Sequence, residues 1–340
     1  MKYSIIFFWK DFNYKNNCFI DRFFKGDKWE YIEDYENADV VLIGSFLYRN
    51  AFYGMFIENF FLNFPHNKLD IAINILQPLY DKFLQENIHD LVIKEHNIIR
   101  KIKGKKILCI SEPWINYFEI LIKEKQFDVI FGCINNDISM NKYKYPLNYF
   151  SFFHEEKDKF KIFEDANIYV KRCEIPQKFC CLICNYDHTN IRTPIYNLLN
   201  NISQVTCPST LHKNCSSEEL DRLGKCEYLK QFKFHICSEN TLNIQGYITE
   251  KLSDCCVSGA IPIYAGNFDD IDARIYNVNR ILFYDSSQES MNFVSKIVQQ
   301  LISSEEAFSE FYRRPVFMDS AANTVMDLEK TLINKVDTLV

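Results

Sequence analysis

One segment, residues 232–267, constrains the fold of this chain more than any other. It begins with an apolar run from Phe232 to Cys237, continues through a polar turn and a short helical stretch, and ends in a second apolar run from Ala260 to Tyr264. A strand, a helix and another strand in this order predict a βαβ unit with its functional groups on one rim. The chain should therefore contain an α/β domain.

The helix of this unit is predicted to begin near Thr249 and to end at Gly259. Its amino end, where Tyr247, Glu250 and Lys251 crowd together, offers free N–H groups and a partial positive charge that suit a phosphate. Lys251 adds a full positive charge, and Glu250 is placed to accept hydrogen bonds from a sugar ring. A simpler explanation needs no ligand: Thr249 is the N-cap, and Glu250 and Lys251 form a solvated first turn.

Strand and helix patterns alternate along the rest of the chain, which indicates parallel sheets and an α/β fold class. Further strand segments are expected at residues 4–8, 38–44, 105–112, 127–132, 179–185, 202–206 and 280–284. Residues 51–101 carry apolar residues at helical spacing. We expect an α/β domain over residues 1–160, a second α/β domain over residues 161–300 and a helical tail over residues 301–340.

The composition is that of a globular protein, with 47% hydrophobic and 25% charged residues. A net charge of −6 without a stripe of Lys or Arg argues against a nucleic-acid partner. No run of about 18 apolar residues occurs, so no membrane span is expected. With no signal peptide seen either, we expect a cytoplasmic or otherwise soluble protein.

Two features raise the question of a metal. Among the 13 cysteines, Cys181 and Cys184 have metal or redox spacing, but no second pair or histidine cluster completes a zinc site. Most cysteines lie in apolar runs, which is typical of reduced, buried side chains. The acidic run from Phe268 to Asp272 is the second feature, and an acidic loop or helix start explains it more simply. No divalent metal or other cofactor is therefore expected.

The central segment resembles the donor-site motif of the α-1,3/4-fucosyltransferases, glycosyltransferase family 10. The motif appears as Ser-Glu-Asn at 238–240, Gly-Tyr-Ile-Thr-Glu-Lys at 246–251 and Ile-Pro-Ile-Tyr-Ala-Gly at 261–266. Its order and spacing match the family, although Ser238 replaces the usual aromatic residue. The resemblance implies the GT-B fold, which has two Rossmann-like domains with parallel sheets facing across a cleft. It assigns the acceptor to the first domain and the GDP-sugar to the second.

The resemblance also implies a set of residues that bind the donor: Arg192, Glu239, Asn240, Tyr247, Glu250 and Lys251. Arg192 and Lys251 are predicted to contact the diphosphate, because a cation can receive its charge. Tyr247 is assigned to the nucleotide sugar and Glu250 to the ribose hydroxyls. Two alternatives stay open: Arg192 as a surface helix residue, and Glu239 as a structural hydrogen-bond acceptor.

Glu112 is the candidate catalytic base. It follows the strand 107–110 at its carboxyl end, and Ser-Glu-Pro at 111–113 resembles the turn that holds the proposed base of the family. The acceptor hydroxyl must lose its proton as it attacks, and a carboxylate is the usual choice for that task. Glu112 could instead cap a helix or be a solvated carboxylate, and Glu119, inside a helical stretch, is its rival.

These observations predict an inverting glycosyltransferase of the hexosyltransferase class that moves fucose from GDP-fucose to a hydroxyl of a glycan. By resemblance, the expected product is an α-1,3 linkage to GlcNAc of an N-acetyllactosamine-type glycan. The expected partners are thus GDP-fucose and a glycan acceptor. One alternative keeps the fold and uses another nucleotide-sugar donor. A second alternative is a non-catalytic protein that binds a nucleotide sugar or a glycan.

Overall fold

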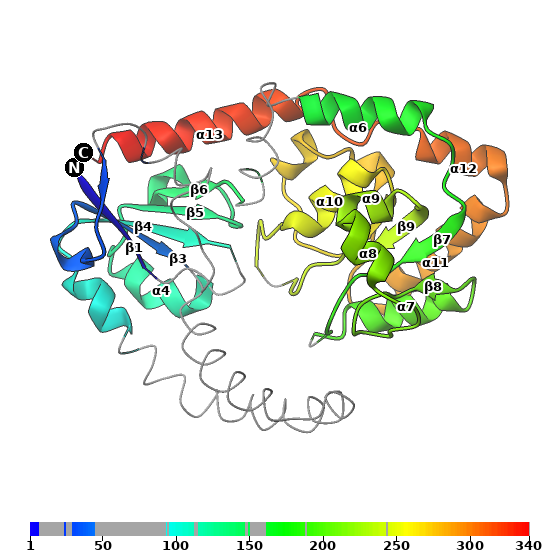
Figure 1. Cartoon of the computed structure of the whole chain (residues 1–340), viewed down its shortest axis with the longest axis horizontal. Coiled ribbons are helices and arrows are strands. Elements are labelled where there is room, and N and C mark those ends of the chain that lie inside the picture. Colours follow the sequence, from blue (N-terminus) through cyan, green and yellow to red (C-terminus); the bar gives the residue numbers. More distant parts are fainter. Residues whose placement is uncertain are drawn as a thin grey trace. The chain divides into compact units, whose positions relative to one another are not determined.

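The computed structural model of the chain describes residues 1–6, 24, 29–44, 93, 95–111, 115–146, 149, 161–187, 189–242 and 244–339 (Figure 1). The chain forms two compact units. Unit 1 comprises Met1–Gly132, Ile138–Lys142 and Ile333–Val340, and unit 2 comprises Cys133–Asp137 and Tyr143–Leu332. Their limits differ from the domain boundaries expected at residues 160 and 300, which stay predictions.

Unit 1 is built around a six-stranded sheet in the order β2-β1-β3-β4-β5-β6. The strands are β1 (Lys2–Ile6), β2 (Glu30–Tyr31), β3 (Val40–Gly44), β4 (Lys105–Ile110), β5 (Val129–Gly132) and β6 (Lys142–Lys144). The pairings among β1 to β5 are all parallel. The central strand β3 is buried along its whole length, as expected for a parallel strand covered on both faces. Helix α4 (Ile115–Lys123) connects β4 to β5.

Unit 2 is built around a five-stranded sheet in the order β11-β10-β9-β7-β8, with parallel pairings throughout. Its strands are β7 (Lys178–Cys181), β8 (Val205–Thr206), β9 (Phe232–Ile236), β10 (Ile261–Tyr264) and β11 (Leu282–Phe283). The α-helices of unit 2 are α6 (Lys161–Arg172), α7 (Arg192–Asn200), α8 (Glu218–Leu223), α9 (Lys225–Leu229), α10 (Glu250–Ser258), α11 (Gln288–Ile302) and α12 (Glu305–Tyr312). Helix α13 (Ala321–Asp337) begins in unit 2, and its residues from Ile333 on belong to unit 1. The expected α/β class with two parallel sheets is confirmed.

The direction of the chain reverses between β7 and β9. From β7 the chain crosses through α7 to β8, whereas from β9 it crosses through α10 to β10 on the other side (Figure 1). Right-handed crossovers that run in opposite directions along one sheet place their helices on opposite faces. In open α/β sheets, ligands bind outside the carboxyl ends of the strands at such a reversal point. The topology therefore predicts a ligand site at the carboxyl ends of β7 and β9.

The predicted βαβ unit is confirmed. Thr249 is the N-cap of α10, and Gly259 ends the helix with φ +83°. A Cβ atom at this glycine would lie 2.8 Å from the ring of Tyr169, so both the backbone conformation and the lack of space favour glycine here. Strands β9 and β10 pair in parallel with Phe234 opposite Ile261. Both residues are completely buried in the core of unit 2.

The structure describes part of the expected helical region at 51–101, most of the cysteines and helices in both units. Residues 95–101 are helical, while residues 51–92 of the expected helical region lie outside the described part. Each described cysteine has a free thiol. Among the described helices, none is long and apolar enough to cross a membrane.

Candidate functional site

The candidate site lies at the carboxyl edge of the sheet in unit 2. The loop after β7 leads into α7, which begins at Arg192. The loop after β9 contains Glu239 and Asn240 and leads to the amino end of α10. Because these strands are parallel and adjacent, their carboxyl ends meet at one edge, and the loops contact each other there.

Arg192 joins these two loops. Its Nη2 donates to the carbonyl of Ser238 at 2.7 Å and to Oδ1 of Asn240 at 2.8 Å, and its Nη1 donates to the carbonyl of Tyr186 at 3.3 Å. Only 2% of its surface is exposed. The alternative of a surface helix residue is therefore wrong. The predicted contact with a diphosphate stays a prediction.

Asp187, which the sequence analysis missed, fixes the start of α7. Its carboxylate accepts the backbone N–H groups of Ile191, Arg192 and Thr193 at 3.0, 2.9 and 2.7 Å. An anion at a helix amino end satisfies unpaired donors and complements the helix dipole. An acidic residue shortly before a predicted helix start was the signal that could have revealed this role.

The contact with Arg192 orients the side-chain amide of Asn240. A guanidinium can only donate hydrogen bonds, so the atom that faces it must be the carbonyl oxygen Oδ1. The amide nitrogen Nδ2 consequently points away from Arg192 and can donate to another group. The loop is also held at its backbone, where Thr189 Oγ1 donates to the carbonyl of Asn240 at 3.1 Å. This half-buried residue thus offers N–H donors at the edge of the sheet.

Glu239 is completely buried, and its carboxylate holds the entry of α10. Its Oε1 accepts the N–H of Thr249 at 2.8 Å and the hydroxyl of Tyr264 at 3.2 Å, and its Oε2 accepts the Thr249 hydroxyl at 2.7 Å. Burial raises the pKa of the Glu239 carboxyl above its usual value, although Lys251 and Thr249 act in the opposite direction. These contacts favour the alternative of a structural acceptor.

Glu250 and Lys251 are the charged residues that α10 presents to solvent at its amino end. The side chain of Glu250 is 51% exposed and that of Lys251 is 22% exposed. Burial opposes ionisation of Glu250, but the charges of Lys251 and Lys225 outweigh it and lower its pKa. The Nζ of Lys251 donates to Thr249 Oγ1 at 3.0 Å and lies 3.4 Å from Glu250 and 3.6 Å from Glu239.

Tyr247 lies in the same loop with its side chain completely buried. The preceding Gly246 has φ +76°, and a Cβ atom there would lie 2.6 Å from the backbone nitrogen of Asn135. Only glycine permits this close approach of two backbones. The predicted contact of Tyr247 with the donor stays a prediction.

Glu112, the predicted base, lies outside the described residues. Strand β4 ends two residues earlier, at Ile110, on the carboxyl edge of the sheet in unit 1. Its rival Glu119 lies on α4 with a largely exposed side chain, 3.3 Å from Nζ of Lys123. The catalytic role of Glu112 stays a prediction.

The acidic run at 268–272 surrounds a lysine. The Nζ of Lys144 donates to Oδ2 of Asp269 at 2.8 Å and to Oδ2 of Asp272 at 2.5 Å, and the Lys144 side chain is fully buried. Burial raises the pKa of Asp272 to about 7. No group of His, Cys, Asp and Glu side chains within the described residues is arranged to hold a metal ion.

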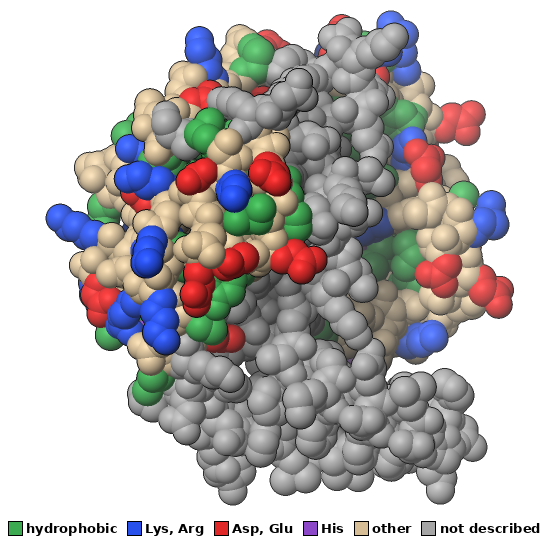
Figure 2. All heavy atoms as spheres, turned by 60° about the vertical axis from the view of Figure 1, so that its left-hand side comes forward, with side chains coloured by type: hydrophobic (Ala, Val, Ile, Leu, Met, Phe, Trp, Pro, Cys, Tyr) green, Lys and Arg blue, Asp and Glu red, His purple; other side chains and the backbone are tan. Residues whose placement is uncertain are grey.

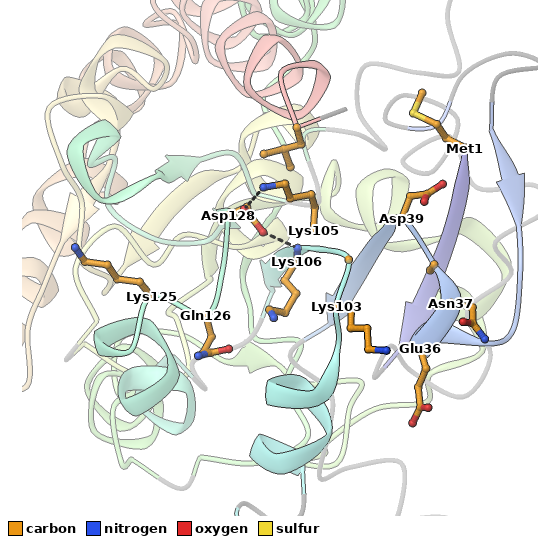
Figure 3. A pocket seen from close by; sticks show the side chains of 13 residues that line it. Met1, Glu36, Asn37, Asp39, Lys103, Lys105, Lys106, Lys125, Gln126 and Asp128 are labelled. Atoms are coloured by element: carbon orange, nitrogen blue, oxygen red, sulfur yellow. Dashed lines mark hydrogen bonds and ion pairs between the residues drawn. The ribbon is translucent and has the colours of Figure 1, made fainter.

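Unit 1 contains a shallow cavity of about 730 Å³ at the amino edge of its sheet, where β3, β4 and β5 begin (Figure 3). Its lining includes Lys103, Lys105, Lys106 and Lys125. Asp128 binds Nζ of Lys105 at 3.2 Å and the backbone N–H of Lys106 at 2.9 Å. Active sites in α/β folds gather at strand carboxyl ends, so we assign no chemistry to this cavity. Elsewhere on the described surface that Figure 2 shows, acidic and basic side chains are interspersed.

Comparison with known proteins agrees with placing the candidate site in unit 2. Residues 173–325 match the family model described as glycosyltransferase family 10 (fucosyltransferase), C-terminal part. This part of the chain is similar to glycosyltransferase family 10. The matched region contains all six predicted donor-binding residues, whereas Glu112 precedes it. These six residues lie on the loops after β7 and β9 and at the amino ends of α7 and α10.

One relative and two solved structures describe the similarity further. The α-(1,3)-fucosyltransferase FucT of Helicobacter pylori is 35% identical over 89 residues, which are 26% of this chain and 18% of that protein. The match thus spans about a fifth of that relative's length. A crystal structure of α1,3-fucosyltransferase with GDP-fucose has a TM-score of 0.60 at 17% identity, over 98% of this chain and 90% of that chain. Another crystal structure of α1,3-fucosyltransferase has a TM-score of 0.61 at 16% identity with the same coverage. At this identity the structures establish the fold alone, and they confirm the GT-B class.

Proposed function

We propose that this chain is an inverting fucosyltransferase, which moves fucose from GDP-fucose to a hydroxyl of a glycan acceptor. The observation that carries the proposal is the amino end of α10 within residues 173–325, the part that matches the family model. There the side chain of Glu250 is 51% exposed and that of Lys251 is 22% exposed, and Asn240 lies on the loop that leads from β9 to this helix. These groups lie at the reversal point of the sheet, where α/β folds bind nucleotides.

The proposed leaving group is a nucleoside diphosphate. Its developing charge would be received by Lys251, by the N–H groups at the start of α10 and by Arg192, and the proposed reaction includes no divalent metal. The Asn240 amide supplies further N–H donors. The ionised carboxylate of Glu250 can only accept hydrogen bonds, so it suits the ribose hydroxyls.

The acceptor hydroxyl would be deprotonated by Glu112 as its oxygen attacks the anomeric carbon of fucose. One displacement forms the new C–O bond, breaks the bond to the diphosphate and inverts the anomeric centre. One carboxylate base is sufficient for this reaction. For the acceptor we propose an N-acetyllactosamine-type glycan, with an α-1,3 linkage to GlcNAc. The H. pylori relative and the solved relatives are each named as an α-1,3-fucosyltransferase.

The first experiment measures GDP release from GDP-fucose with and without N-acetyllactosamine. Release should depend on the acceptor, and it should fall at least a hundredfold in Glu112→Ala, in line with the usual contribution of a general base. Lys251→Ala should also lose release, because the leaving group loses a cation. Glu119→Ala is the matched control, since this exposed carboxylate lies on the helix after the proposed base, and it should keep wild-type activity.

The two alternatives give different results in the same assay. Another nucleotide-sugar donor predicts that a different nucleoside diphosphate competes better than GDP for the site. A non-catalytic protein predicts GDP binding without acceptor-dependent release. Absence of both release and GDP binding would contradict the proposed function altogether.

A further inference from the structure

We propose that Glu239 is a positioning residue, which acts through Thr249 to hold Lys251 in place for a nucleoside diphosphate. The inference rests on the proposed function for its ligand. It concerns a residue that resemblance alone assigned to direct contact with the donor.

The backbone of Glu239 is fixed by the sheet. Its N–H donates to the carbonyl of Ala265 at 2.8 Å, which extends the pairing of β9 with β10 beyond the strand ends. The preceding N–H of Cys237 makes the same kind of bond with Ile263 at 3.1 Å. The carboxylate therefore starts from backbone that is paired with the β10 side of the sheet, and a group held in this way can fix the position of a loop.

The carboxylate joins the three pieces of the family motif. It starts from the Ser-Glu-Asn piece, accepts the N–H and the hydroxyl of Thr249 in the second piece, and accepts the hydroxyl of Tyr264 in the third. Gly266 belongs to this arrangement, because a Cβ atom there would lie 2.1 Å from the Tyr264 hydroxyl oxygen. In the contacts described, both carboxylate oxygens of Glu239 act as hydrogen-bond acceptors.

Proton counting then fixes the contact with Lys251. The single hydroxyl proton of Thr249 is donated to Glu239. The lone pairs of that hydroxyl are thus available to the N–H and the Nζ of Lys251, at 3.4 and 3.0 Å. An ammonium can only donate hydrogen bonds. Every donor among Glu239, Thr249 and Lys251 therefore meets an acceptor when the Thr249 hydroxyl donates to Glu239 and accepts from Lys251. A change at Glu239 reverses the hydroxyl and removes the acceptor that holds Lys251.

Charge and position predict opposite effects when Glu239 is replaced by Gln, which makes the inference testable. Removing a negative charge 3.6 Å from Lys251 would by Coulomb attraction alone strengthen the binding of a diphosphate. The new amide N–H₂ would instead face the Thr249 hydroxyl and compel it to turn its proton toward Lys251. Weaker binding therefore cannot come from the loss of the charge, and it is the result that lost positioning predicts.

The experiment measures GDP affinity by calorimetry on the full chain. We expect Glu239→Gln and Thr249→Val each to weaken binding about tenfold, and the double variant to be no weaker than either. In a Lys251→Met background, Glu239→Gln should change the affinity less than about twofold. Ser253→Ala is the control, because it removes a buried hydrogen bond of 2.7 Å to Tyr276 further along α10. It should lower stability and leave GDP affinity unchanged.

Several outcomes would overturn the inference. These are unchanged or tighter GDP binding in Glu239→Gln, the same tenfold loss in the Lys251→Met background, or an equal loss in Ser253→Ala. If Glu239→Gln does not fold, Thr249→Val in both backgrounds decides by the same criteria. Wild-type protein that binds no GDP would instead overturn the proposed function, and the positioning role would fall with it.

Discussion

At the scale of single residues, burial separates side chains that the sequence could not tell apart. Arg192 and Glu239 are buried and hold loops, whereas the side chain of Glu250 is exposed and that of Lys251 is half-buried at the amino end of α10. All four were assigned to the same donor by resemblance, and Glu239, Glu250 and Lys251 belong to one motif. A charged residue just after a strand can point into the sheet edge or into solvent, and its neighbours in sequence do not determine which.

Arg192→Lys tests the bridging role of the guanidinium. A lysine keeps the charge, but its single nitrogen cannot occupy the positions of both Nη1 and Nη2, so buried acceptors lose their partners. We expect a loss of about 2–3 kcal/mol in the free energy of unfolding, measured by urea denaturation. Arg222→Lys, an exposed change on α8, should stay within about 0.5 kcal/mol of wild type. Equal stability of the two variants would contradict the bridge.

At the scale of elements, the sequence predicted unit 2 well. The apolar runs gave β7, β9 and β10 within a few residues, and Thr249 and Gly259 gave both ends of α10. Local patterns suffice for such features because a strand end, a cap or a left-handed turn depends on a few neighbouring residues. Strand order could not be predicted, since the pairing of β7 with β9 joins segments about 50 residues apart.

The glycine at the end of α10 makes an element-scale prediction. Gly259→Ala introduces both a strained left-handed backbone and a Cβ atom 2.8 Å from the Tyr169 ring. We expect a loss of about 3 kcal/mol in the free energy of unfolding, the sum of strain and overpacking. In a Tyr169→Ala background the loss should fall to about 1–2 kcal/mol, because the closest contact is removed while the strain remains. A loss that is the same in both backgrounds would show that the ring is not the obstacle.

At the scale of the whole molecule, the features that the sequence analysis missed are those that join distant segments. Lys144 and Asp272 are 128 residues apart in the chain, yet they form a buried ion pair in unit 2. From the sequence, the acidic run could only be described by its own composition, as a solvated loop or a metal site. A buried cation that approaches from elsewhere leaves no local pattern, so this contact required the fold.

This ion pair predicts how stability changes with pH. Burial raises the pKa of Asp272 to about 7, so the folded state binds a proton that the unfolded state releases at a much lower pH. For a carboxyl whose pKa is raised on folding, the contribution to stability is complete below the unfolded value of about 3.9 and is lost as the pH rises through about 7. The titratable groups near Asp272 include Lys144, Asp269, Tyr149, Tyr264 and Tyr276. These neighbouring groups are present in wild type and in a variant that changes Asp272 alone. Their own effect on the free energy of unfolding therefore largely cancels when the two proteins are compared.

The measurement compares wild type with Asp272→Asn by urea denaturation between pH 4 and 8. The free energy of unfolding of wild type relative to the variant should fall as the pH rises, by an amount on the order of 4 kcal/mol over the whole range. Asp270→Asn, at an exposed carboxylate two residues away, is the matched control for a surface change in the same loop. A constant difference between wild type and Asp272→Asn would mean that Lys144 keeps Asp272 ionised throughout. In that case the attraction of the buried ammonium, rather than the cost of burial, decides the charge of this pair.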